Sequence, residues 1–101
     1  MKNVKYYIEG LDLADGGVAP NFYQIVIHND DYTPMEFVMH ILEKFFYMDR
    51  RKAAEIMLQA HMQGKAVCGM YSKDVAESKI TLVKEHAKQQ QYPFNCSMEF
   101  A

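Results

Sequence analysis

The chain has 101 residues, half of them apolar, which is enough for one compact domain with a single modest core. Its 11 basic and 13 acidic residues give a formal charge of -2, so the sequence lacks the broad positive field that binds nucleic acid or anionic lipid. No apolar run is long enough for a membrane span or a secretory signal, and we expect a soluble, cytoplasmic protein.

The first 20 residues carry three glycines and a proline among scattered acidic side chains, with no sustained period of two or 3.6 residues. We interpret residues 1–20 as a flexible arm without a packed element, and residues 21–101 as the folded domain. From Phe22 to Ile27 the side chains are mainly aromatic or β-branched. This run predicts a first strand that ends at the polar residues 28–31.

A first helix is predicted to begin at Thr33, its N-cap, with Pro34 at the first helical position and Glu36 completing a capping box. It is expected to end at about Tyr47. Its apolar stripe at helical spacing consists of Val38, Ile41, Leu42, Phe45 and Phe46. Such a stripe has to be buried against another element.

A second helix is predicted to follow its cap Asp49 and to end at Gly64. The residues that share one face of it, by the i, i+4, i+7, i+8 rule, are Ala53, Met57, Ala60 and His61. Residues 65–71 are predicted to form a second strand. A third helix then starts from a cap at Ser72 or Asp74 and ends at the glutamines 89–91 and Pro93.

The third helix and the C-terminal residues complete the pattern. The helix turns Ala76, Ile80, Val83 and Ala87 inward. The apolar residues that alternate with polar ones after it, as in a half-buried strand, are Phe94, Cys96, Met98 and Phe100. The order β-α-α-β-α-β predicts an α+β fold in which three helices pack on one face of a small three-stranded antiparallel sheet, whose other face stays wetter.

Polar residues between the first strand and the first helix are the first candidates for function. A loop at such a junction can present Asn29, Asp30 and Asp31 as acceptors without burying them fully. Considered alone, these residue types are more often ordinary turn residues that bond their own backbone.

Two separated runs make the chain resemble the ClpS family of Clp protease adaptors. They are NDDYTPMEFV from Asn29 to Val38 and HMQGKA from His61 to Ala66, and the resemblance covers roughly residues 22–101. It implies the ClpS fold and a non-enzymatic adaptor that binds substrates with N-terminal Leu, Phe, Tyr or Trp. The implied partner is the N-terminal domain of the ClpA unfoldase. We expect a monomer without a cofactor or metal.

The resemblance also implies a site. Asn29, Asp31 and His61 match residues that bind the free α-amino group of the substrate, and Asp30 beside them would meet the backbone or hold the loop. An ammonium group brings one positive charge and three donors, which suits this set of acceptors. The residues that match the side-chain pocket are Ile27, Thr33, Met35, Val38, Met57, Ala60 and Phe94. Without the two runs, His61 would be a satisfied helix-face histidine, and the apolar residues would be core.

Two pocket positions depart from the family. A Val is common where Ala60 stands and a Leu where Phe94 stands, so we expect an altered ranking among Phe, Trp, Tyr and Leu. On the protease side, Asp74 and Lys79 match residues that contact ClpA, although Asp74 replaces a more usual Glu. On sequence alone they are a helix cap and a solvated surface lysine.

Two other functions stay open. The first is a metal-dependent or hydrolytic enzyme built on the polar residues His28, Asp30, Asp31 and His61, although no nucleophile stands beside a base and no HExxH run occurs. The second is a plain interaction module that binds through a helix face. Cys68 and Cys96 form no CxxC pair, and we expect them to be buried free thiols.

Overall fold

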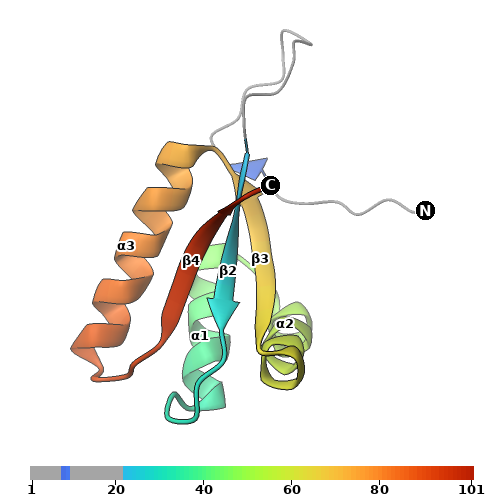
Figure 1. Cartoon of the computed structure of the whole chain (residues 1–101). Helices are drawn as coiled ribbons and strands as arrows, with labels where there is room; N and C mark the ends of the chain where they lie inside the picture. The colour runs from blue at the N-terminus through green and yellow to red at the C-terminus, as the bar shows by residue number, and fades with distance from the viewer. Residues whose placement is uncertain (1–7, 10–21) are drawn as a thin grey trace, which may run out of the picture.

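The computed structural model describes residues 8–9 and 22–101 of the chain. The elements follow in the order β1 (Ile8–Glu9), β2 (Tyr23–His28), α1 (Met35–Phe46), α2 (Arg50–Gln63), β3 (Lys65–Tyr71), α3 (Lys73–Gln89) and β4 (Asn95–Phe100). Figure 1 shows the three helices on one side of the sheet. From β2 onward this is the order β-α-α-β-α-β, and the predicted α+β fold is confirmed.

The sheet has the strand order β1-β3-β2-β4, and β2 pairs antiparallel with both of its neighbours. Ile27 of β2 lies opposite Ala66 of β3 and Cys96 of β4, so their side chains point to the same face. The pairing of β2 with β3 shifts register between Ile25 and Val26. Beyond this bulge, the regular antiparallel register continues to His28, where the functional loop begins.

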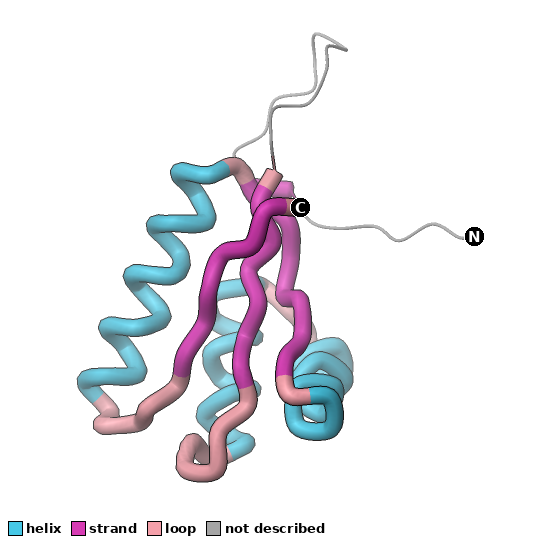
Figure 2. The backbone as a smooth tube through the Cα atoms, in the orientation of Figure 1, coloured by secondary structure: helices cyan, strands magenta, loops and turns pink. Residues whose placement is uncertain are grey.

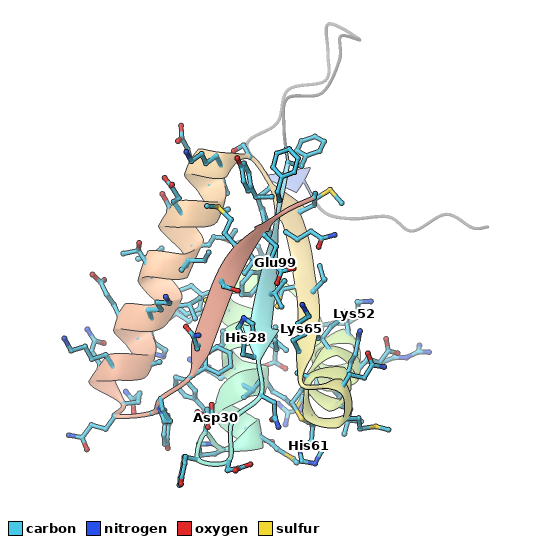
Figure 3. The ribbon with its side chains drawn as sticks, viewed as in Figure 1. His28, Asp30, Lys52, His61, Lys65 and Glu99 are labelled. Atoms are coloured by element: carbon cyan, nitrogen blue, oxygen red, sulfur yellow. The ribbon has the colours of Figure 1, made fainter. Side chains whose placement is uncertain are left out.

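The core lies between the helices and the inner face of the sheet. Ile25 and Ile27 of β2 and Ile41 and Leu42 of α1 are completely buried. The outer face, which is turned to the viewer in Figure 3, carries the polar side chains of His28, Lys65 and Glu99. This difference between the faces agrees with the predicted pattern.

The expected capping box of α1 is wrong. The N-cap is Pro34, whose carbonyl oxygen accepts from the N–H groups of Phe37 (3.0 Å) and Val38 (3.2 Å). Thr33 lies one residue before the N-cap, and its hydroxyl donates to the Asp30 carboxylate at 2.8 Å. Glu36 pairs with Arg50 of α2 at 2.6 Å. A local hydrogen bond within the loop and an ion pair with α2 therefore take the place of the predicted capping box.

The predicted ends of the other helices agree better with the structure. The Asp49 side chain accepts from the N–H of Lys52 at 2.8 Å, as predicted for the cap of α2. Ser72 is the N-cap residue of α3, although its side chain makes no capping hydrogen bond. In β4 the alternation ends before Phe100, which is 64% exposed and meets the Tyr23 ring edge-on.

Most of the expected N-terminal arm, residues 1–20, lies outside the described residues. Within the described part, Ile8 and Glu9 pair in parallel with Met70 and Tyr71 of β3, so the expectation of no packed element is wrong for these two residues. The physical reason is that a sheet edge presents unpaired backbone groups, which bind another backbone whatever its side-chain pattern.

Both cysteines are free thiols. Cys96 is completely buried, as expected, and Cys68 is partly buried. Burial raises the pKa of Cys96 to about 11, so this thiol stays protonated and packs as a small apolar side chain.

Candidate functional site

The loop between β2 and α1 is organised by Asp30. One carboxylate oxygen accepts from the backbone N–H groups of Tyr32 (2.8 Å) and Thr33 (2.7 Å), and the other accepts from the Thr33 hydroxyl (2.8 Å). Burial by itself would raise the pKa of Asp30, but these three donors outweigh burial and hold the pKa below its ordinary value. Asp30 is therefore ionised and holds the loop, while Asn29 and Asp31 beside it are exposed.

The C-terminal end of α2 is joined to this loop. Gly64 ends the helix with a φ of 91°, which a glycine adopts without strain, and its N–H donates to Ala60 O at 2.8 Å. The Asn29 N–H donates to Gly64 O at 2.9 Å. The tube in Figure 2 shows that this connection lies at the same end of the sheet as the β2–α1 loop. Figure 3 places Asp30 and the exposed His61 at this end.

A cavity of about 200 Å³ opens here. This volume is below the roughly 300–1,000 Å³ of pockets for drug-sized ligands, and it suits a single side chain. The lining residues come from β2, the β2–α1 loop, α1, α2 and the connection to β4. They are Ile27, His28, Asn29, Asp30, Asp31, Thr33, Met35, Val38, Met57, Ala60, His61 and Phe94. All eleven residues that the sequence indicated for amino-group binding and for the side-chain pocket are in this set.

The cavity has a polar part and an apolar part. The polar part comes from the loop and from the end of α2, where Asn29, Asp31 and His61 are all exposed. The apolar part is buried, with Ala60 at 4% and Phe94 at 5% exposure. An acceptor-rich mouth thus leads into an apolar interior, which suits a ligand with a cation next to a hydrocarbon group.

His28 is the one lining residue that the sequence argument did not assign to this site. Its Nε2 atom lies 2.7 Å from the Ser97 hydroxyl of β4. The sequence could have indicated His28 as a site residue, because it directly precedes Asn29 at the end of a predicted strand. Among residues 8–9 and 22–101, no group of three or more His, Cys, Asp or Glu side chains is placed to hold a metal ion. None of the helices in that part of the chain is long and apolar enough to cross a membrane.

Comparison with known proteins decides the family. A family model for the ATP-dependent Clp protease adaptor protein ClpS matches residues 19–97. The chain belongs to the ClpS family. Among proteins named ATP-dependent Clp protease adapter protein ClpS, that of Vibrio atlanticus is 51% identical over 80 residues, covering 79% of this chain and 76% of the relative. That of Salmonella arizonae is 44% identical over 90 residues, covering 89% and 85%.

A solved ClpS structure has the same fold. The structure of Agrobacterium tumefaciens ClpS2 bound to L-phenylalaninamide matches with a TM-score of 0.79 and 33% identity, covering 81% of this chain and 99% of that one. The resemblance drawn from the two sequence runs is thereby confirmed, and the chain is an adaptor of the Clp protease.

In this ClpS chain, the two residues implied for ClpA contact lie at the other end of α1. Asp74 is exposed in the first turn of α3, and it lines a groove together with Lys79. The remaining lining residues of this groove are Lys44, Phe45, Tyr47, Val75, Ser78 and Leu82. Tyr47 and Leu82 are apolar side chains with 70% and 52% exposure.

Lys79 is not the solvated lysine that the sequence indicated, since only 7% of it is exposed. Its ammonium donates to Phe45 O at 2.7 Å, where the last turn of α1 leaves carbonyl groups without helical partners. It also lies between 4.9 and 5.8 Å from the ring centroids of Phe46, Tyr47 and Tyr71. The end of one helix and the faces of three rings hold this cation, and local sequence could not reveal that packing.

Proposed function

We propose that this ClpS chain recognises substrates through a free N-terminal amino group and a first residue that is Leu, Phe, Tyr or Trp. One observation carries the proposal: polar acceptors and an apolar pocket meet in a single cavity of about 200 Å³. The ligand of the Agrobacterium tumefaciens relative supports it. L-phenylalaninamide has a free α-amino group and an amide in place of the carboxylate, as the first residue of a peptide has.

For the amino group, we assign Asn29 Oδ1, the Asp31 carboxylate and a neutral ring nitrogen of His61 as acceptors. Asp31 supplies the directly contacting negative charge, because the Asp30 oxygens already accept three hydrogen bonds from the loop. The ionised Asp30 carboxylate, which also lines the cavity, adds a second negative charge without contacting the ammonium directly. Internal or capped residues lack the cation and are rejected, since they leave these acceptors without a donor.

For the first side chain, burial of a Leu, Phe, Tyr or Trp group contributes roughly 2–4 kcal/mol at about 25 cal/mol per Å². Met35, which is 49% exposed at the rim, is flexible enough to close over an aromatic ring but fits poorly against a β-branched side chain. With Ala60 and Phe94 in place of Val and Leu, the pocket gains room at one wall and loses it at another. This exchange retunes the ranking among apolar residues.

The chain would then deliver its substrate to the N-terminal domain of a ClpA-type unfoldase. The groove at the end of α1 supports this part, because it offers the exposed charge of Asp74 beside the exposed apolar side chains of Tyr47 and Leu82. Lys79 shapes the floor of the groove from its buried position. On this proposal the protein acts as a cytoplasmic monomer and catalyses no reaction itself.

Fluorescence anisotropy with matched peptides tests the recognition step. A peptide that begins with free Phe should bind at least about tenfold more tightly than its N-acetyl twin, because acetylation removes charge-assisted hydrogen bonds. Peptides that begin with Leu should bind and those with Ile should bind weakly. Asp31→Asn should remove most of the preference for the free amine. Glu85→Gln, an exposed acidic position on α3, serves as the control and should leave the preference intact.

Equal affinity for the free and acetylated peptides would contradict the proposal. That result would favour the plain interaction module, since a surface that binds a partner through a helix face does not distinguish a capped terminus from a free one.

A further inference from the structure

Phe94, the aromatic wall of the cavity, is supported from behind by another ring. Phe37 of α1 does not line the cavity, but its ring meets Phe94 at a centroid distance of 6.3 Å with an interplanar angle of 81°. Phe37 is 9% exposed and packed inside the core, whereas Phe94, 5% exposed, borders the cavity on one side and meets Phe37 on the other. The position of Phe94 in the pocket therefore depends on Phe37.

Phe37 is held in turn by two rings from the C-terminal part of the domain. His86 of α3 stacks on it at 5.6 Å with an angle of 16°, and Tyr92, in the connection to β4, packs against it at 4.7 Å. His86 also contacts the rings of His40 and Phe45 of α1. A continuous layer of rings thus runs from the surface between α1 and α3 to the wall of the cavity.

The charge state of His86 suits this stacking. Burial lowers the pKa of His86, and the electrostatic effects of Lys44 and His40 lower it further, so the ring is neutral at neutral pH. A neutral imidazole stacks on Phe37 as another aromatic ring does, without the cost of desolvating a charge.

We propose that Phe37, supported by His86, is a positioning residue that sets the size of the side-chain pocket by fixing the ring of Phe94. This inference rests on the proposed function and adds to it a second layer of residues that determine specificity. Removal of the Phe37 ring leaves space behind Phe94, and the Phe94 ring retreats into it. The cavity then widens, which favours the largest N-terminal side chain, Trp, over Leu.

Two matched variants on one helix test this. Phe37→Leu should shift the ratio of the Trp-peptide and Leu-peptide dissociation constants in favour of Trp by about 3-fold to 10-fold, the size of a lost ring pair. Phe46→Leu makes the same substitution at a buried phenylalanine of α1 whose ring packs against Tyr71 and does not line the cavity. It should change the ratio by less than about 2-fold, although it also loses a ring pair.

A second pair of variants keeps the test independent of the stability of Phe37→Leu. His86→Ala should shift the ratio in the same direction, and His86→Phe should restore the wild-type ratio, because it retains a flat ring at the stacking position. An unchanged ratio in both Phe37→Leu and His86→Ala, or an equal shift in Phe46→Leu, would overturn the inference. Failure of the proposed function shows itself separately, as wild-type protein that binds free and acetylated peptides alike.

Discussion

At the scale of single residues, Asp30 shows how one carboxylate can shape a site by holding its loop. Its three hydrogen bonds lie within the loop from Asp30 to Thr33, in which its neighbours Asn29 and Asp31 are exposed. The sequence left its role open between contacting the backbone and holding the loop. The structure shows both, because the backbone that it contacts is the loop itself.

Thr33→Val is expected to raise the pKa of Asp30 toward its ordinary value, because burial remains while one of the opposing hydrogen bonds is lost. In the wild type the folded-state pKa lies below the unfolded-state value. Asp30 therefore stabilises the fold at neutral pH, and this contribution disappears as the pH falls through the folded-state pKa. In the variant the contribution is smaller.

The measurement is an NMR titration of the Asp30 side-chain carboxyl carbon. Thr81→Val, at an exposed position on α3, is the control and should leave the Asp30 pKa unchanged. A variant at Thr33 that titrates like the wild type would show that the hydroxyl contributes nothing to the loop.

At the scale of elements, the structure separates what local patterns predict from what they miss. The bounds of β3 and the caps Asp49 and Gly64 follow from residue types at fixed spacing, and they were predicted correctly. The start of α1 and the burial of Lys79 were not. At the start of α1, Thr33 bonds to Asp30 within the loop and Glu36 pairs with Arg50, 14 positions later. The ammonium of Lys79 binds a carbonyl 34 positions earlier in the chain.

Lys79→Met retains the aliphatic stem but removes the cation, so it should lower the free energy of unfolding by about 1–3 kcal/mol. The loss comes from the hydrogen bond to Phe45 O and from the contacts with the rings beneath α3. Urea denaturation measures it. Lys84→Met, an exposed lysine on the same helix, should change the stability by no more than about 0.5 kcal/mol. Equal effects of the two substitutions would disprove a structural role for Lys79.

At the scale of the whole molecule, the two candidate surfaces occupy opposite ends of α1. Met35 and Val38 line the cavity, while Phe45 and Tyr47 line the groove. A helix of 12 residues separates these ends by roughly 18 Å, which exceeds the screening length of about 8 Å at physiological salt. A charge change at the groove should therefore leave the cavity unaffected.

Asp74→Lys should weaken binding to the N-terminal domain of a ClpA-type unfoldase by roughly tenfold or more, because it reverses an exposed charge in the proposed contact. Its affinity for an N-terminal Phe peptide should stay within about 2-fold of the wild type. Glu85→Lys makes the same charge change on the same helix outside the groove, and it should alter neither affinity. If both variants lose unfoldase binding equally, the groove is not the contact surface.

The residues that line the cavity could be predicted from the sequence, but the side chains packed behind them could not. All eleven assigned positions line one cavity, because the two runs that identify the family also carry most of its lining. Phe37 lies inside one of these runs but was absent from both the predicted core stripe and the predicted site. Helical spacing indicates which side of α1 is apolar, but only the tertiary structure shows that His86 and Tyr92 stack there.

The hydrogen bond from Asn29 to Gly64 also bears on how new adaptors could be engineered. This main-chain link joins the two segments that carry the proposed amine acceptors, whereas Ala60 and Phe94 line the apolar part of the same cavity. A designer could therefore reprogram the preferred terminal residue at these two positions and keep the demand for an unblocked terminus. Amine recognition and residue choice would then behave as separate modules of one small scaffold.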